Sequence, residues 1–163
     1  MKTTISFLLL VLCQFHECEL PDEVQRLIDT NSIALIHKDS LVDDWTLFIN
    51  SNCPTIAVGD FNGDGINDYG ILARTSTEDK NYSFQIVQSN EDDYELIHIM
   101  DIGFGIYDGG LGFGIETVSA KRQEEEYEIP NAKHASIIFI KFESSSQLIY
   151  FDGKEYQTTW IGD

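Results

Sequence analysis

Short runs of β-branched and aromatic residues, separated by turn-forming residues, recur along the chain from residue 45 onwards. Runs of this length and composition are typical of strands. They predict strands over residues 45–49, 55–58, 69–73, 82–88, 94–100, 135–142, 148–151 and 155–160. The polar segment 89–93 predicts one hairpin, and Asp152-Gly153 predicts another with a tight two-residue turn. We therefore expect a mainly β fold built from antiparallel strands and hairpins.

Two segments depart from this strand pattern. After Pro21, acidic residues occupy a first turn, where a helix dipole favours them, and apolar residues follow at helical spacing, at Val24, Leu27 and Ile28. They predict one short N-terminal helix over residues 21–30. Residues 121–134 carry many charges and no apolar period, which predicts an exposed loop or a charged hairpin tip.

The N-terminus has the pattern of an export signal. Lys2 precedes an unbroken apolar run over residues 5–12, which is far shorter than the ~20 residues needed to span a bilayer. We expect residues 1–13 to be a signal peptide, with cleavage as late as residue 18, and no transmembrane span. A lipid anchor on Cys13 or Cys18, or a buried first strand or helix, is the alternative. Residues 19–163 are then expected to form a single β-rich domain in the periplasm or outside the cell.

The chain is strongly acidic. It has 28 acidic and 10 basic residues among 163, and a net charge of −18. Nucleic acids and anionic membrane surfaces are bound through Lys and Arg, so both are disfavoured as partners. Calcium ions and basic proteins are compatible with this charge, although such a surface also keeps a protein soluble without any partner.

Three cysteines, Cys13, Cys18 and Cys53, are too few for a disulfide scaffold. Removal of the signal peptide would leave Cys18 and Cys53, which are able to form one bridge in an oxidising compartment. The sequence leaves this pairing open. The four histidines have no partner at the spacing of zinc ligands, so we expect none of them to bind metal.

The segment with the most specific chemistry is loop 60–68, which reads DFNGDGIND. Oxygen-bearing side chains occupy its positions 1, 3, 5 and 9, namely Asp60, Asn62, Asp64 and Asp68. Ca²⁺ takes about six to eight oxygens, and alternate residues of a tight loop turn inward to supply them. The backbone carbonyl of Ile66 is the expected ligand at position 7, which leaves its side chain free to point into the core. Gly65 permits the sharp left-handed turn that such a loop needs. Together, these positions predict that the loop binds calcium.

This loop does not belong to an EF-hand, because its twelfth position is Ile71 instead of a bidentate Glu. Strand-like segments, 56–58 and 69–73, flank it on both sides. The pattern D-x-[DN]-x-D-G-x-x-D between two strands resembles the FG-GAP or VCBS-type repeat. The resemblance implies a single β-loop-β calcium motif with metal bound at the positions already named. The order of elements is similar to that of small exported, mostly bacterial proteins with one such loop and no known function.

Repetition is missing elsewhere, because no second copy of the calcium pattern occurs in the chain. A propeller made of such repeats is therefore not expected. The sequence GFGI occurs at residues 103–106 and again at 112–115, but it has no Lys and does not match a phosphate-binding loop. We interpret these glycines as turns and close strand approaches, with the phenylalanines packed inward. A ligand or partner surface, or a second cation site at Asp101 and Asp108, is the alternative.

Signatures of catalysis are absent, since no G-x-S-x-G, H-E-x-x-H or Cys-His pattern occurs. The leading hypothesis is an exported calcium-binding module that is not an enzyme, in which the metal is structural and function comes from binding a partner. The rival is an acidic inhibitor or immunity-type protein that neutralises a basic toxin or lytic enzyme, with residues 101–116 as a plug. A calcium-dependent hydrolase ranks last, because no nucleophile or base is apparent.

Overall fold

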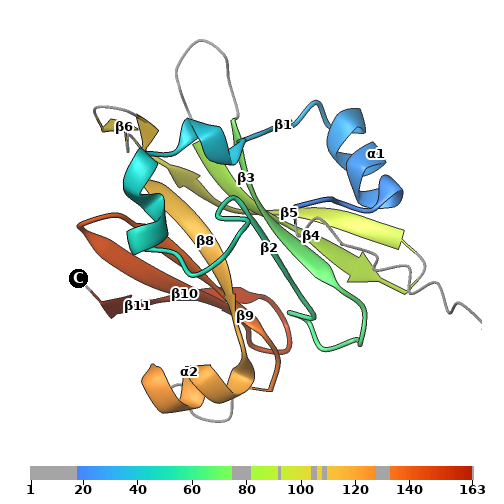
Figure 1. Ribbon diagram of the computed structural model, residues 1–163. Coiled ribbons are helices and arrows are strands. Elements are labelled where there is room, and N and C mark those ends of the chain that lie inside the picture. Colours follow the sequence, from blue (N-terminus) through green and yellow to red (C-terminus); the bar gives the residue numbers. More distant parts are fainter. Residues whose placement is uncertain are drawn as a thin grey trace, which may run out of the picture.

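The computed structural model describes residues 18–74, 82–91, 93–103, 106–107, 110–127 and 133–162. The expected signal peptide, residues 1–13, lies outside the described residues. Figure 1 shows two β-sheets packed face to face, with short helices at their margins. All pairings between the named strands are antiparallel. The prediction of a mainly β fold with antiparallel strands is confirmed.

The first sheet contains five strands, which are β1 (Ala34–Leu35), β2 (Ile56–Gly59), β3 (Asp68–Arg74), β4 (Tyr82–Asn90) and β5 (Asp93–Ile102). Their order is β1-β3-β4-β5, and β2 also pairs with β3, beside a different stretch from the one that β1 occupies. The predicted hairpin at residues 89–93 joins β4 to β5, where Asn90 pairs with Asp93.

The second sheet has the order β11-β10-β9-β8. Its strands are β8 (Phe113–Val118), β9 (Ser136–Lys141), β10 (Ser145–Phe151) and β11 (Tyr156–Gly162). A separate two-stranded ladder joins β6 (Ile106–Tyr107) to β7 (Gly110–Leu111). The predicted hairpin between β10 and β11 is present, but its turn spans residues 152–155, because the N–H of Asp152 donates to the carbonyl of Glu155. The turn is therefore shifted by one residue from the expected Asp152-Gly153, with Gly153 and Lys154 at its centre.

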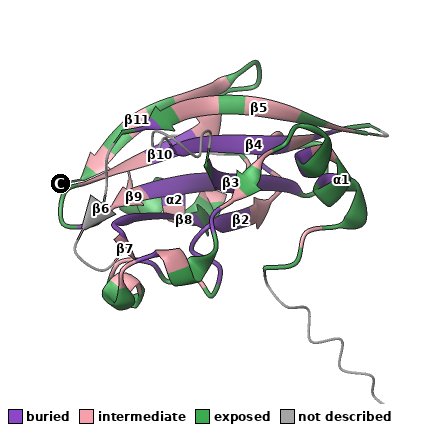
Figure 2. Ribbon diagram, turned by 90° about the horizontal axis from the view of Figure 1, so that it is seen from above, coloured by how far each residue is buried: buried purple, intermediate pink, exposed green. Residues whose placement is uncertain are grey.

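The main core lies between the two sheets. It joins alternate residues of β3 and β4, such as Leu72 and Phe84, to Phe113 of β8 and Ile137 of β9, all of which are almost completely buried. Period-2 alternation places these side chains on the inner faces. Figure 2 shows that the buried residues concentrate in these central strands, while the outer strands are more exposed.

A helix covers the outer face of the first sheet. This helix is α1 (Asp22–Thr30), and it buries Val24 and Ile28 against Tyr69, Ile71 and Val87. The arrangement explains why β3 is apolar on both faces. The predicted N-terminal helix is confirmed within one residue. A disulfide joins Cys18, which lies ahead of α1, to Cys53, so the pairing that the sequence left open does form.

One flank of the sandwich is closed by contacts between the two sheets. The N–H of Ile115 in β8 donates to the carbonyl of Pro54, just before β2, over 2.7 Å. The hydroxyl of Thr117 donates to the carbonyl of Val58 over 3.0 Å. Gly114 allows this approach, because a Cβ at that position would lie 2.8 Å from the carbonyl oxygen of Pro54. The interpretation of this glycine as a close strand approach is confirmed.

The strand predicted over residues 45–49 is wrong. The chain forms two 3₁₀ helices in this region, η1 (Lys38–Ser40) and η2 (Asp43–Leu47). Trp45 and Ile49 lie four residues apart and turn inward together, whereas Leu47 is 77% exposed. A strand would have placed all three side chains on one face. The β-branched and aromatic composition was therefore misleading here.

A second helix occupies the first part of the segment 121–134, which was predicted to be a loop or hairpin tip, and residues 128–132 of that segment lie outside the described residues. This helix is α2 (Ala120–Glu126), which begins after Ser119, whose hydroxyl accepts a hydrogen bond from the N–H of Arg122. Pairs four residues apart, Lys121 with Glu125 and Arg122 with Glu126, support it. Among the described residues, no helix is both long and apolar enough to cross a membrane.

Candidate metal-binding loop

Loop 60–68 connects β2 to β3, whose antiparallel register pairs Gly59 with Asp68 and Ile56 with Ile71. The loop therefore closes a hairpin, as the strand-like flanks predicted. Gly63 and Gly65 both have positive φ, at 86° and 88°. Glycine adopts this backbone region without strain, so these two positions fold the loop back on itself.

Three of the predicted ligands point into the loop. The carboxylate of Asp60 accepts hydrogen bonds from the N–H groups of Gly63 at 2.6 Å and Gly65 at 3.0 Å. The amide oxygen of Asn62 accepts from the N–H of Asp64 at 3.0 Å. One carboxylate oxygen of Asp64 accepts from the N–H of Ile66 at 2.7 Å. These contacts turn the oxygen-bearing side chains of positions 1, 3 and 5 toward the loop backbone, as the sequence predicted.

Asp68 has a different environment from the other loop carboxylates, because it is completely buried. Its Oδ2 accepts hydrogen bonds from the N–H groups of Phe61 and Asn62, at 2.7 and 3.1 Å. Its Oδ1 accepts from the N–H and the hydroxyl of Ser89, at 2.7 and 2.8 Å. Burial raises the pKa of Asp68 above its ordinary value, against the opposing effect of these four hydrogen bonds. Asp68 therefore ties both ends of the loop to β4.

Ser89 is a site residue that sequence reasoning missed. Besides its bonds to Asp68, its hydroxyl lies 2.7 Å from Oδ2 of Asp64, and its carbonyl accepts from the amide nitrogen of Asn62 at 3.1 Å. Burial acts to raise the pKa of Asp64, but hydrogen bonds from Ser89, Ile66 and Asn62 outweigh it and lower that pKa. The loop is therefore assembled against β4 as well as within its own hairpin.

Two further features of the loop were not anticipated, namely the exposure of Ile66 and the contact with His134. The side chain of Ile66 is 39% exposed, so the expectation that it would point into the core is wrong. The imidazole of His134, which comes from the segment before β9, covers Gly63 so closely that a Cβ at that position would overlap its ring. The carbonyl of His134 in turn accepts a hydrogen bond from the buried Gln123 of α2 at 2.8 Å. The segment before β9, which is bonded to α2, therefore packs against the loop at Gly63.

Clusters of acidic, cysteine or histidine side chains that could hold a metal are absent from the part of the chain that the structure describes. No three His, Cys, Asp or Glu side chains lie close enough together to hold a metal ion, and this includes Asp60, Asp64 and Asp68 of loop 60–68. Of the alternative second cation site, Asp101 lies 3.4 Å from the imidazole of His98, and Asp108 lies outside the described residues. Clusters of this kind contain only His, Cys, Asp and Glu side chains. Two of the ligands predicted in loop 60–68 are of other types, the side-chain amide of Asn62 and the backbone carbonyl of Ile66.

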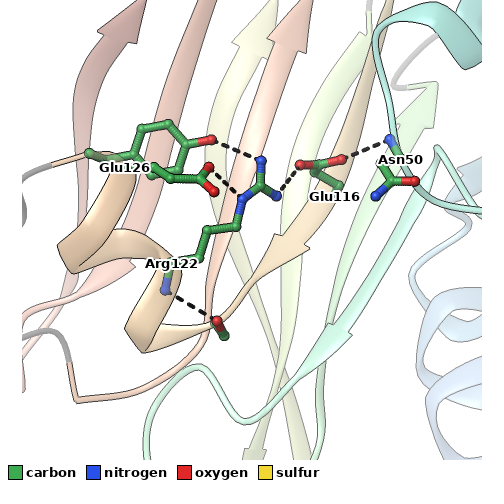
Figure 3. A network of polar contacts seen from close by, with 6 residues as sticks. Asn50, Glu116, Arg122 and Glu126 are labelled. Atoms are coloured by element: carbon green, nitrogen blue, oxygen red, sulfur yellow. Dashed lines mark hydrogen bonds and ion pairs between the residues drawn. The ribbon is translucent and has the colours of Figure 1, made fainter.

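The most extensive ion-pair network of the described residues lies away from this loop (Figure 3). Glu116 of β8 has a side chain that is only 7% exposed, and its two oxygens bind Arg122 at 2.8 Å and the N–H of Asn50 at 2.9 Å. Arg122 also donates to Glu126 at 2.6 Å. This last bond raises the pKa of Arg122, burial lowers it, and the bond to Glu116 raises it again, with a net upward shift. The network fastens α2 to β8 and to the segment before β2, which is a structural role.

No family model, curated protein or solved structure matches the chain.

Proposed function

We propose that this protein is a calcium-binding β-sandwich module in which the metal orders loop 60–68. The observation that carries the proposal is the inward orientation of Asp60, Asn62 and Asp64 on successive alternate positions of a turn with two left-handed glycines. Carboxylate, amide and peptide oxygens are the ligands that calcium prefers. The resemblance to the FG-GAP or VCBS-type repeat, noted from the same residues, agrees with this donor set and remains part of the proposal.

The donor set fits calcium if four of the five predicted residues bind the ion and the fifth, Asp68, braces the loop. Asp60, Asn62, Asp64 and the carbonyl of Ile66 would hold the ion, and water would complete the shell. Each oxygen of Asp68 already accepts two hydrogen bonds from protein groups, which occupy its lone pairs. We therefore assign Asp68 the role of bracing the loop, while the metal itself supplies positive charge among neighbouring carboxylates.

The test is the metal dependence of thermal unfolding, measured by calorimetry with calcium and then with a chelator. Binding to the folded state alone stabilises it by about 2.7 kcal/mol when free calcium is about 100 times Kd. We expect a Kd of about 10⁻⁵ to 10⁻³ M, as for extracellular modules, and a weaker response to magnesium, which demands smaller octahedral sites. A melting temperature that neither calcium nor chelator changes, with no heat of binding at millimolar calcium, contradicts the proposal.

A matched pair of variants separates loss of the site from loss of charge. Asp64→Asn removes one carboxylate from the proposed site and should abolish most of the calcium-induced shift. Asp152→Asn removes one carboxylate from the β10–β11 turn, where Asp152 likewise accepts backbone hydrogen bonds, from Lys154 and Glu155. The Asp152 variant should keep the full calcium response. An equal loss in both variants would indicate a nonspecific effect of charge.

We also propose that the protein is exported and acts by binding a partner. The Cys18–Cys53 disulfide supports export, because such bonds persist in oxidising compartments. A C-terminally tagged chain should be recovered outside the cytoplasm and shortened by about 13 to 17 residues, because cleavage after residue 18 would remove Cys18 and its disulfide. Recovery of the intact chain from the cytosol would contradict export.

The rival proposal, an acidic inhibitor with residues 101–116 as its plug, receives no support from that segment. Phe113 and Ile115 are completely buried in the core. The part of the segment that the structure describes beyond residue 110 is thus mostly a core strand and offers little surface to a partner.

A further inference from the structure

The two flanks of the sandwich are built differently. One flank is closed by the contacts between β2 and β8 described above. At the opposite ends of the strand orders, β5 and β11 each pair with a single neighbour, and no other described strand adds to them. An unpaired edge strand presents backbone N–H and C=O groups that can bond to another extended chain. The described strands therefore leave two free sheet edges, one at β5 and one at β11.

The edge strands differ in how they are protected against pairing. Soluble proteins normally place charged residues or proline on their free edges, which discourages the addition of another strand. β5 follows this rule, since its exposed residues are acidic or histidine, namely Asp93, Glu95, His98 and Asp101. β11 reads YQTTWIG and contains neither a charge nor a proline. In a chain with a net charge of −18, this strand is an unusual neutral edge.

Exposure of side chains marks the same strand. Trp160 is 65% exposed, and Thr158 is exposed two residues earlier, on the same side of the strand. Tryptophan is enriched among the residues that contribute most to protein interfaces. β11 therefore combines free backbone groups with a large apolar contact residue.

The electrostatic surroundings of β11 indicate which kind of chain would be accepted there. The turn that leads into β11 exposes Asp152 and Glu155, with Lys154 as its one cation. These exposed carboxylates at the start of β11, in a chain with a net charge of −18, favour a cationic partner. A second copy of this chain would bring another net charge of −18.

We propose that the outer edge of β11 is a docking surface for an extended, cationic segment of a partner protein, which would add to the second sheet as a further strand. Backbone hydrogen bonds to β11 would supply affinity that is independent of sequence, as in other cases of strand addition. Trp160 would contact an apolar or cationic side chain of the segment, and the surrounding carboxylates would select positive charge. This surface is distinct from the proposed calcium site, which lies in loop 60–68.

The test uses nuclear magnetic resonance with two blocked heptapeptides, KTVKVTK and its counterpart ETVEVTE, titrated into the intact protein at low salt. The lysine peptide should shift the backbone amides of β11 and the indole N–H of Trp160, with a Kd on the order of 10⁻⁴ to 10⁻³ M. The glutamate peptide should bind at least about tenfold more weakly.

Variants locate the surface and separate it from the calcium site. Trp160→Ala and Thr158→Lys should each weaken binding of the lysine peptide by about fivefold or more. Leu47→Ala removes another highly exposed apolar residue, from η2, and should have no effect. Asp64→Asn should also leave binding of the lysine peptide unchanged, even where it abolishes the response to calcium. Failure of calcium binding and failure of docking can thus be told apart.

Four outcomes would overturn the proposal. They are equal binding of the two peptides, shifts confined to β5 or to other elements, no shift at up to about 5 mM lysine peptide, or unchanged binding in Trp160→Ala. Light scattering that shows a dimer of the protein, lost in Trp160→Ala, would identify a second copy as the occupant and likewise refute the cationic segment.

Discussion

Ser89 binds Asp68 through two groups at once, its backbone N–H at 2.7 Å and its hydroxyl at 2.8 Å, and both bonds are buried. The pair links β4 to the end of the proposed metal loop. The same hydroxyl also lies within hydrogen-bond distance of Asp64. One serine therefore connects the bracing carboxylate to a proposed calcium ligand.

We predict that Ser89→Ala destabilises the protein by about 1 to 3 kcal/mol, because it removes a buried donor from Asp68. The free energy of unfolding from urea denaturation measures this effect. Ser144→Ala, in the exposed turn after β9, is the control and should change stability by less than about 0.5 kcal/mol. Equal stabilities of the two variants would show that the hydroxyl of Ser89 is unimportant.

Gly63 and Gly65 provide a test of the contact with His134. Alanine at either position must adopt a left-handed backbone conformation, which lowers the free energy of unfolding by about 1 to 2 kcal/mol. Only Gly63→Ala also overlaps the imidazole of His134, since nothing lies within 4 Å of a Cβ at Gly65. Gly63→Ala should therefore lower the melting temperature more than Gly65→Ala does. Addition of His134→Ala should recover part of the difference, and a failure to do so would contradict the packing described here.

Arg122→Met should destabilise the protein, because it leaves the buried carboxylate of Glu116 without its cation. The side chain of Arg122 is 38% exposed, so solvent reduces the cost to about 2 kcal/mol, below that of a fully buried pair. Lys121→Met removes a charge whose side chain is 80% exposed and should cost less than about 1 kcal/mol. Chemical denaturation of both variants checks the ranking, which a larger loss in the Lys121 variant would reverse.

Reduction of the Cys18–Cys53 disulfide should lower stability by about 3 to 4 kcal/mol, because the bridge joins residues 35 positions apart and restricts the unfolded chain. Cys18→Ser should reproduce this loss. Dithiothreitol should destabilise the wild-type protein while leaving Cys18→Ser unchanged. A reductant effect of equal size in the variant would mean that the thiol reagent acts elsewhere.

Much of the sheet structure was predictable, because the composition of short β-branched and aromatic runs between turn-forming residues is a local property of the sequence. It failed where apolar spacing was ambiguous: Trp45 and Ile49 suit either a strand or a helical turn, and only burial of one face decides between them. α2 was missed because its charged sequence has little apolar period, although its pairs four residues apart were visible. The strand β8 was missed because its glycines suggested turns, whereas Gly114 accommodates the approach of Ile49 and Pro54.

The candidate site was predictable only in part for a related reason. Spacing within loop 60–68 identified the side chains that turn inward, since that depends on nearby residues. It did not identify Ser89, which is 21 residues from Asp68 in the sequence and reaches it only after β4 has paired with β3. It also could not assign Asp68 to bracing, because that role follows from donors at the start of the loop and on β4.

The attachment of Asp68 to Ser89 means that loop 60–68 is not a portable cassette. A hairpin cut at residues 56–71 and grafted onto another protein would keep Asp60, Asn62 and Gly65 but would leave behind two of the four donors to Asp68. The carboxylate of Asp68 would then lack half of its hydrogen-bond donors, and the free-energy cost of burying it in that state opposes closure of the loop. A protein engineer who wishes to transplant this site must therefore carry the third strand, β4, along with it.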